Sequence, residues 1–178
     1  MKRFVALLAV FAFLPAYAAL KVGDKAPDFS TQASLGGKVF RYTLSMALKD
    51  GPVVLYFYPA AFTKGCTIEA HDFAAAVDQY KALGATVIGV SHDSIETLAK
   101  FSVSECGSKF PVAADFDQSI MKSYDAVLVP VLGYASRTSY VIAPDGRVIY
   151  SYSDMNPDKH VTNTLTALRQ WAAEQKRP

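Results

Sequence analysis

The chain has 178 residues, of which 51% are hydrophobic and 19% are charged, and its formal net charge is +2. This length fits one domain that buries a hydrophobic core without disulfides or metals. The small charge gives no basic surplus to favour nucleic acid as a partner, and the three histidines, His71, His92 and His160, show no metal-ligand spacing, so we expect neither a metal nor another cofactor.

Residues 1–18 have the pattern of a secretory signal peptide. Lys2 and Arg3 precede an apolar run from Phe4 to Leu14, and Ala16-Tyr17-Ala18 has the small-x-small pattern of a cleavage site. The run is too short for a membrane anchor, which needs roughly 18 to 25 residues. We therefore predict export to the bacterial periplasm, with a signal peptide at 1–18, a single domain at 19–178 and no membrane contact after cleavage. Cleavage leaves 16 basic and 16 acidic residues.

The first half of the predicted domain contains a strand–helix–strand unit. Gly23 to Phe29 is expected to be an extended lead-in, and Gly36-Gly37 to Leu44 a small hairpin. Pro52–Tyr58 and Ala85–Ser91 are continuously apolar, as strands covered on both faces of a parallel sheet are. Between them, a helical stripe ends at Gly84, a typical C-cap residue. The stripe consists of Ile68, Phe73, Ala76, Val77, Tyr80 and Leu83.

Shorter elements are predicted next. A second helix is expected to begin at Asp93-x-x-Glu96, which resembles a capping box. A short strand at Phe110–Ala114 and a short helix at Gln118–Tyr124 follow, and then an apolar loop, Val127–Tyr134. The buried stripe predicted for the second helix is Ile95, Leu98, Ala99, Ser102 and Cys106.

The last part of the chain predicts a hairpin and a helix. Thr138–Ala143 and Arg147–Tyr152 flank Pro144-Asp145-Gly146, which is typical of a β-hairpin turn. Asn156-Pro157 then begins a helix. The order of all these elements packs most simply as an α/β fold, with a central mixed β-sheet and helices on both faces. The buried face predicted for the last helix is Val161, Leu165, Leu168 and Ala172.

One cysteine, Cys66, lies where the first apolar strand gives way to the helix. Unpaired N–H groups and the positive end of the helix dipole favour a thiolate there, and Lys64 and Gly65 add a cation and an open backbone. By position alone, a reactive thiol and a small buried apolar residue fit equally well. The second cysteine, Cys106, also leaves a structural disulfide open in an exported protein.

Pro59, Thr63 and Cys66 stand as P-x-x-x-T-x-x-C, which resembles the active-site signature of the peroxiredoxins. The resemblance extends over essentially the whole chain after residue 18 and is closest to the PrxQ, or bacterioferritin comigratory protein, branch. It implies a thioredoxin-like fold and a thiol-dependent peroxidase that reduces hydrogen peroxide and organic hydroperoxides. The further matching segments are Gly23 to Phe29, VVLYFYP, GCTIEA, Ser91 to Ser94, Phe110-Pro111 and Arg137 to Ile142.

The resemblance also implies roles for single residues. Cys66 is the peroxidatic cysteine, which cycles through a sulfenic acid, and Thr63 is a donor to the peroxide. Arg137 keeps the thiolate and donates to peroxide oxygen, although position alone favours a surface arginine. Pro59 shields the sulfur from water. Glu69 is expected to be engaged by Arg137 or another donor, because an unpaired carboxylate would oppose the thiolate; a solvent-facing glutamate is the alternative.

The sequence departs from the branch at the resolving cysteine. His71 occupies the position, five residues after Cys66, where many PrxQ members have it, and we expect His71 to be solvated or to act as a cap. Cys106 is then the only internal candidate, with burial in the apolar stripe as the alternative. If it is buried, an external thiol, either thioredoxin-like or a small molecule, reduces the sulfenic acid. Monomer and homodimer both stay open.

Two other functions share this predicted fold. A disulfide oxidoreductase would have Cys-x-x-Cys, but Thr63 occupies the place of its first cysteine. A copper-binding protein would have Cys-x-x-x-Cys, but Ala70 occupies the place of its second cysteine. Both patterns are therefore incomplete, and the peroxidase is the better-supported reading.

Overall fold

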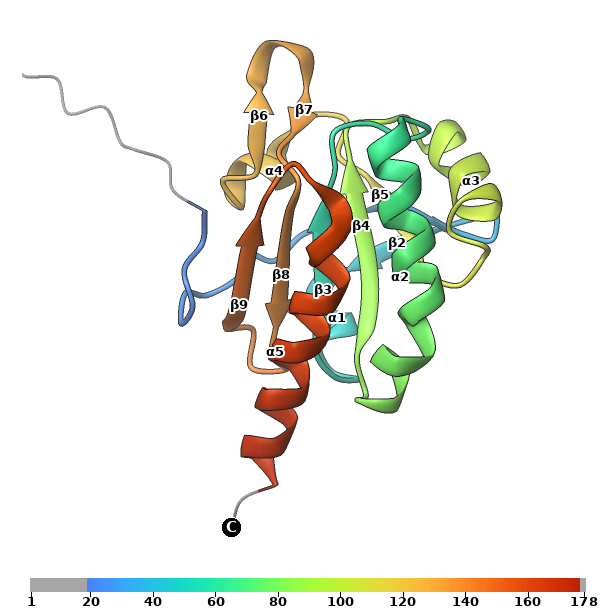
Figure 1. The fold of residues 1–178 in the computed structure, drawn as a ribbon. Helices are drawn as coiled ribbons and strands as arrows, with labels where there is room; N and C mark the ends of the chain where they lie inside the picture. Colours follow the sequence, from blue (N-terminus) through green and yellow to red (C-terminus); the bar gives the residue numbers. More distant parts are fainter. Residues whose placement is uncertain (1–18, 177–178) are drawn as a thin grey trace, which may run out of the picture.

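The computed structural model describes residues 19–176, and these residues form a seven-stranded mixed sheet with helices on both faces (Figure 1). The strand order is β2-β1-β5-β4-β3-β8-β9. β3, β4 and β5 run parallel, whereas β1 and β8 pair with their neighbours in the antiparallel sense. The strands of this sheet are β1 (Ser30–Leu35), β2 (Lys38–Thr43), β3 (Val53–Phe57), β4 (Thr86–Ser91), β5 (Val112–Ala114), β8 (Thr138–Ile142) and β9 (Val148–Ser153).

Two hydrophobic cores lie on the two faces of the sheet, because successive side chains of a strand point to opposite sides. Helices α2 (Lys64–Ala82), α3 (Ile95–Ser104) and α5 (His160–Gln175) contribute to one core, and α1 (Leu44–Ala47) and α4 (Ser119–Ser123) to the other. Val54 and Tyr56 of β3 point into the first core, and Leu55 points into the second. The predicted α/β fold with a mixed sheet is therefore confirmed.

The central strand β3 brings distant parts of the chain to one end of the sheet. All of its residues are buried, because it lies between β4 and β8. Its antiparallel register with β8 pairs Phe57 with Thr138. The loop that leads from β3 into α2 therefore lies at the same end of the sheet as Arg137, which precedes β8.

The start of the second predicted helix is one residue later than expected. The N-cap of α3 is Ser94, whose hydroxyl accepts the N–H of Thr97 at 3.3 Å. The carboxylate of Asp93 is not a cap: it accepts the N–H of Ala61 at 2.8 Å and the hydroxyl of Ser91 at 2.7 Å. Asp93 therefore braces the loop before α2 against the end of β4.

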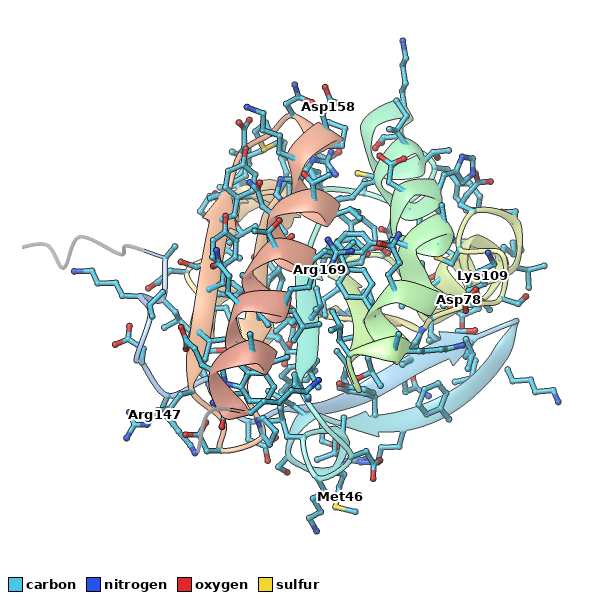
Figure 2. All side chains as sticks on the ribbon, turned by 60° about the horizontal axis from the view of Figure 1, so that its bottom comes forward. Met46, Asp78, Lys109, Arg147, Asp158 and Arg169 are labelled. Atoms are coloured by element: carbon cyan, nitrogen blue, oxygen red, sulfur yellow. The ribbon has the colours of Figure 1, made fainter. Side chains whose placement is uncertain are left out.

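The buried face of the last helix overlaps the predicted face only in part, since Leu165 and Leu168 are shared. Asn156-Pro157 begins a short 3-10 helix, η2 (Pro157–Lys159), and α5 begins only at His160. Its buried residues are His160, Thr164, Leu165 and Leu168, whereas Val161 and Ala172 are only partly buried. α5 lies beside α2, and Arg169 donates to the side-chain oxygen of Gln79 at 2.8 Å between them (Figure 2).

The segment predicted as an apolar loop is a small hairpin made of β6 (Val127–Val129), η1 (Pro130–Leu132) and β7 (Tyr134–Ala135). Across residues 19–176, every helix is too short or too polar to span a bilayer. The expected signal peptide, residues 1–18, lies outside the described residues.

Candidate active site

Cys66 lies in the first turn of α2, and its side chain points into the core. Thr63 is the N-cap residue and has extended backbone angles, so the helix begins at Lys64. Only 2% of the surface of Cys66 is exposed. The first-turn N–H groups of a helix have no partner within the helix, and the positive end of the dipole lies there. This position therefore favours an anion despite its burial.

The guanidinium of Arg137 lies beside the sulfur. Its Nη2 is 3.6 Å from Cys66 Sγ, and the arginine is only 3% exposed. Two other contacts fix its orientation: Nη1 donates to Glu69 Oε2, and Nε donates to the carbonyl of Met155 at 3.0 Å. A buried cation with this orientation favours the charged form of the thiol.

Gly65 leaves the space that the guanidinium occupies. A Cβ atom at this position would lie 3.0 Å from Nη2 of Arg137, closer than ordinary van der Waals contact. The residue before the cysteine therefore has to be small for the arginine to reach the sulfur. Sequence reasoning assigned Gly65 an open backbone but did not connect it with Arg137.

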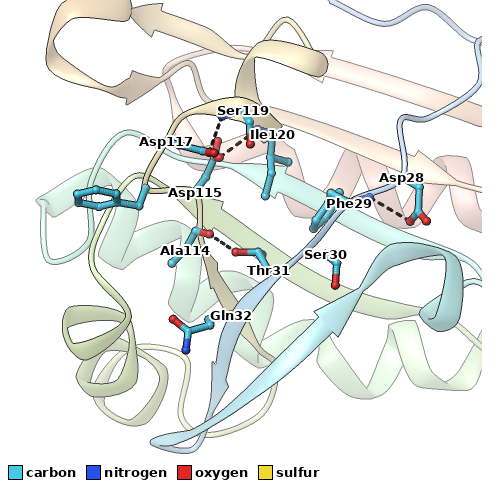
Figure 3. Close-up of a pocket in the computed structure, with 11 residues that line it drawn as sticks. Asp28, Phe29, Ser30, Thr31, Gln32, Ala114, Asp115, Asp117, Ser119 and Ile120 are labelled. Carbon is cyan, nitrogen blue, oxygen red and sulfur yellow. Dashed lines mark hydrogen bonds between the residues drawn. The ribbon is translucent and has the colours of Figure 1, made fainter.

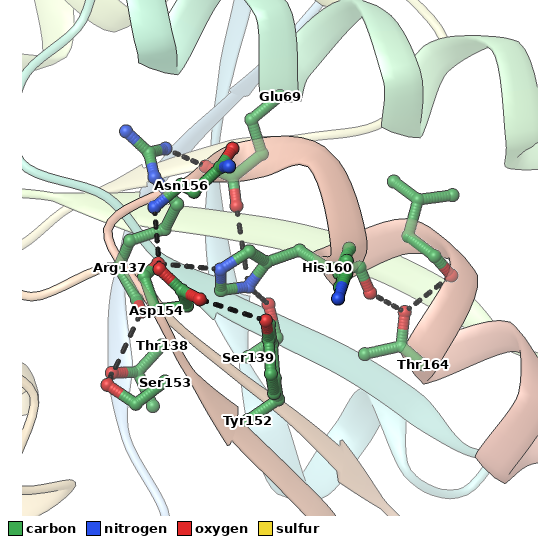
Figure 4. Close-up of polar contacts among 12 residues, drawn as sticks. Glu69, Arg137, Thr138, Ser139, Tyr152, Ser153, Asp154, Asn156, His160 and Thr164 are labelled. Carbon is green, nitrogen blue, oxygen red and sulfur yellow. Dashed lines mark hydrogen bonds and ion pairs between the residues drawn. The ribbon is translucent and has the colours of Figure 1, made fainter.

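Glu69 lies one helical turn beyond Cys66 and is fully buried. Burial raises the pKa of this carboxyl to about 8, against the opposing effect of Arg137, and Asp72 raises it further. The alternative of a solvent-facing glutamate is wrong, and the expected engagement by Arg137 is present (Figure 4). A protonated Glu69 leaves more of the charge of Arg137 to the sulfur than a deprotonated Glu69 would.

Thr63 and Pro59 belong to the loop between β3 and α2. Thr63 is exposed, and its hydroxyl donates to the carbonyl of Ala60 at 2.9 Å. Pro59 is half-buried. Donation from Thr63 to a peroxide requires its hydrogen to leave Ala60, so the role expected for Thr63 stays a prediction, as does the shielding role of Pro59.

Cys106 lies just beyond the last turn of α3 and is fully buried. It packs in the same core as Cys66, and its N–H donates to the carbonyl of Phe101 at 3.1 Å. Burial raises the pKa of its thiol, and Glu105 raises it further. Both cysteines are free thiols here. The alternative of a buried residue therefore describes Cys106 in this conformation.

His71, at the position five residues after Cys66, is half-exposed and bonded. Its Nε2 lies 2.9 Å from the carboxylate of Glu105. This contact links α2 to the end of α3, next to Cys106. The expectation of a solvated histidine is confirmed, and His71 in addition ties two helices together.

Sequence reasoning missed His160 as a member of the site. Its ring is fully buried, and Nδ1 lies 3.7 Å from Glu69 Oε1 (Figure 4). The available signal was its helical spacing from Thr164 and Leu168, which places His160 on the buried face of α5. A histidine search limited to metal-ligand spacing does not detect this signal.

A surface cavity elsewhere on the molecule does not include the thiol. It is lined by residues 28–32 and by residues of the segment 114–120, which includes the start of α4 (Figure 3). Its buried carboxylate, Asp115, accepts the N–H groups of Ile120 and Met121 at 3.0 and 2.8 Å. Asp115 therefore serves to satisfy the first-turn N–H groups of α4.

Comparison with known proteins identifies the family. The model of the AhpC/TSA family matches residues 22–151. A putative peroxiredoxin bcp of Helicobacter pylori is 38% identical over 158 residues, which cover 84% of this chain and 98% of that protein.

Solved structures agree with this match. The crystal structure of the peroxidoxin BcpB of Mycobacterium tuberculosis has a TM-score of 0.78 and 30% identity, and the match covers 85% of this chain and 97% of that one. A PrxQ mutant of Xylella fastidiosa has a TM-score of 0.77 and 26% identity, with 87% and 99% covered. The fold is thus the thioredoxin-like fold of these proteins. We conclude that this chain belongs to the AhpC/TSA family of peroxiredoxins, in its PrxQ, or bacterioferritin comigratory protein, branch.

Proposed function

We propose that this protein is a thiol peroxidase that reduces hydrogen peroxide and organic hydroperoxides at Cys66. The observation that supports this most strongly is the buried guanidinium of Arg137, 3.6 Å from the sulfur. A fixed positive charge at this distance stabilises the thiolate, and the thiolate is the nucleophilic form of cysteine. It also meets the negative charge that develops on the leaving oxygen.

The reaction begins with attack of the Cys66 thiolate on one oxygen of the hydroperoxide. The S–O bond forms while the O–O bond breaks, and the electron pair leaves with the second oxygen. That oxygen takes a proton and departs as water or an alcohol, and Cys66 becomes a sulfenic acid. Arg137 and the first-turn N–H groups of α2 hold the peroxide in line with the sulfur.

The sulfenic acid is then reduced by a thiol. Attack by this thiol forms a disulfide and releases water, and a second thiol restores Cys66. The burial of Cys106 favours an external reductant, either thioredoxin-like or a small molecule, because a buried thiol whose pKa is raised supplies little thiolate to attack the sulfenic acid. Mass spectrometry after one equivalent of peroxide distinguishes an internal disulfide from a persistent sulfenic acid, and undiminished cycling by Cys106→Ser would exclude an essential resolving role.

We also propose that the protein works after export, as a single domain formed by residues 19–178. The support is the pattern of residues 1–18, with two basic residues, a short apolar run and Ala16-Tyr17-Ala18. Expression of the full chain in a Gram-negative host should give a periplasmic product that begins at Ala19. A cytoplasmic product that retains Met1 would contradict this proposal.

The decisive experiment measures peroxide consumption with dithiothreitol as the reductant. The purified protein should consume hydrogen peroxide and an organic hydroperoxide, and Cys66→Ser should lose this activity while keeping its circular dichroism spectrum. Dimedone should label Cys66 after addition of peroxide. Undiminished consumption by Cys66→Ser would remove the proposed mechanism.

A further inference from the structure

One oxygen of the buried carboxyl of Glu69 has no hydrogen-bond partner. Oε2 accepts from Arg137, but Oε1 has no bond. A buried polar atom without a partner is costly and calls for an explanation. His160 on α5 faces this oxygen, with its Nδ1 3.7 Å from Oε1 (Figure 4).

The hydrogen bonds of His160 define its tautomer. Its Nε2 is 2.9 Å from the carbonyl of Asp154, and a carbonyl only accepts, so Nε2 carries the hydrogen. Its Nδ1 is 2.8 Å from the hydroxyl of Ser139. Burial lowers the pKa of His160, and the charge of Arg137 lowers it further. The ring is therefore neutral near neutral pH. Its Nδ1 accepts the hydroxyl hydrogen of Ser139 and brings a partial negative charge to 3.7 Å from Glu69 Oε1, which is too far for a hydrogen bond.

His160 is also linked to Arg137 through backbone hydrogen bonds of Asp154 and Met155. The carbonyl of Asp154 accepts from His160, and the N–H of Asp154 donates to the carbonyl of Arg137 at 3.1 Å. The next carbonyl, that of Met155, accepts from Nε of Arg137 at 3.0 Å. His160 thus holds the short segment that fixes one end of the guanidinium, while Glu69 fixes the other.

The charges around this cluster come from three parts of the fold. Helix α2 contributes Cys66, Glu69 and Asp72, and Arg137 comes from the start of β8. Asp154, just beyond β9, acts on His160, and the ring of Tyr152 within β9 packs edge-on against the His160 ring, with the ring centroids 4.8 Å apart. Within residues 19–176, Glu69 has an ion-pair contact with Arg137 and lies 3.7 Å from the neutral ring of His160. A deprotonated Glu69 therefore competes with the thiolate for Arg137.

We propose that His160 is a positioning residue for the peroxidase site: it holds Arg137 against the sulfur through Asp154 and Met155, and the partial negative charge of its Nδ1, 3.7 Å from Oε1, disfavours the deprotonated form of Glu69. The inference rests on the proposed function, because it concerns the reactivity of Cys66. Its two parts use different nitrogen atoms of one ring. Two substitutions therefore separate them.

The first variant, His160→Gln, places an amide near Nε2 and removes Nδ1. In the wild type, kcat/KM for hydrogen peroxide should fall above about pH 8, where Glu69 loses its proton. In His160→Gln, the pH at which kcat/KM decreases should be about one unit lower, which is roughly a tenfold loss of kcat/KM at a fixed alkaline pH. At pH values below this decrease, kcat/KM should stay within about threefold of the wild type. A decrease at the same pH as in the wild type would overturn the role of Nδ1.

The second variant, His160→Asn, keeps a polar atom near Nδ1 and loses the bond to Asp154. It should lower kcat/KM by roughly tenfold at every pH, because the segment that holds Arg137 is released. The pH above which kcat/KM decreases should be the same as in the wild type. Activity equal to that of the wild type would overturn the backbone part of the inference.

Two further measurements keep this inference separate from the proposed function. NMR titration of the Glu69 carboxyl carbon should show the same downward shift in His160→Gln, whether or not the protein consumes peroxide. Absence of wild-type peroxidase activity would defeat the proposed function, and an unshifted titration would defeat the inference.

Two control variants accompany these measurements. Glu69→Gln should lack the decrease of kcat/KM at alkaline pH. His71→Gln, which changes the half-exposed histidine outside the cluster, should keep the pH dependence of the wild type.

Discussion

The two cysteines lie in one core but at opposite kinds of helix end. Cys66 is in the first turn of α2, and Cys106 follows the last turn of α3. They are 2% and 0% exposed. Cys66 has a guanidinium 3.6 Å from its sulfur, whereas Cys106 has the carboxylate of Glu105 as its charged neighbour.

This comparison separates burial from charge. Burial disfavours a thiolate at both positions, since it removes water from the charged form. At Cys66, the positive end of a helix dipole and the charge of Arg137 offset this cost of burying a thiolate, whereas the charged neighbour of Cys106 is a carboxylate. We therefore expect the buried Cys66 to be reactive because of the charges around it, and Cys106 to be unreactive.

Removal of the cation should have the largest effect. Arg137→Gln keeps a side chain that can donate hydrogen bonds but loses the positive charge, so kcat/KM for hydrogen peroxide should drop by roughly 100- to 1,000-fold. Steady-state kinetics with dithiothreitol measure this drop. Arg147→Gln is the matched control, since Arg147 is largely exposed and lies outside the site. A drop of less than about threefold in Arg137→Gln would mean that charge does not distinguish the two thiols.

Direct alkylation compares the two thiols in one experiment. With iodoacetamide at neutral pH, Cys66 should react at least about 100-fold faster than Cys106, because burial and Glu105 both raise the pKa of the Cys106 thiol. Mass spectrometry of peptides over time gives both rates. Comparable alkylation rates of the two cysteines in the folded protein would contradict the claim that the surrounding charges make them differ in reactivity.

A smaller change tests how closely the cation has to approach. Gly65→Ala should lower kcat/KM by about tenfold, because the new Cβ would lie 3.0 Å from Nη2 of Arg137 and displace it. The alkylation rate of Cys66 should fall with it, while that of Cys106 stays unchanged. A wild-type rate at Cys66 would show that the guanidinium tolerates displacement.

At Cys106, the expected effect is on stability. Cys106→Ser buries a hydroxyl in an apolar core and should lower the free energy of unfolding by about 1 to 3 kcal/mol. Urea denaturation of the reduced protein measures this. Equal stability of the variant would indicate that Cys106 is not packed as the structure shows.

The smallest effect is expected for the contact that links the two regions. His71→Ala removes the bond to Glu105, but His71 is half-exposed, so the free energy of unfolding should fall by no more than about 1 kcal/mol. The same urea titration measures it. A larger loss, or a changed alkylation rate at Cys106, would show that this contact couples the helix ends.

Much of this structure was predictable from local patterns. The apolar runs at β3 and β4, the helical stripe of α2 and the hairpin around Gly146 were all expected. Local signals also misled at helix ends. Asp93 has the composition of a cap, but its carboxylate is used by Ala61 and Ser91, and Ser94 caps α3 instead. Ile68 fits the helical stripe and yet is 38% exposed, since Cys66, Glu69 and Ala70 occupy the inner face there.

By itself, the sequence determined that a cysteine begins a helix after a buried strand, because strand and helix periodicity and the N-terminal N–H groups depend on residues close along the chain. Only the tertiary structure decided which groups surround that cysteine. Arg137 is 71 positions away and reaches the sulfur because β3 and β8 pair in a particular register. His160 reaches Glu69 because α5 packs beside α2. Such contacts depend on strand register and helix packing, which no local spacing contains.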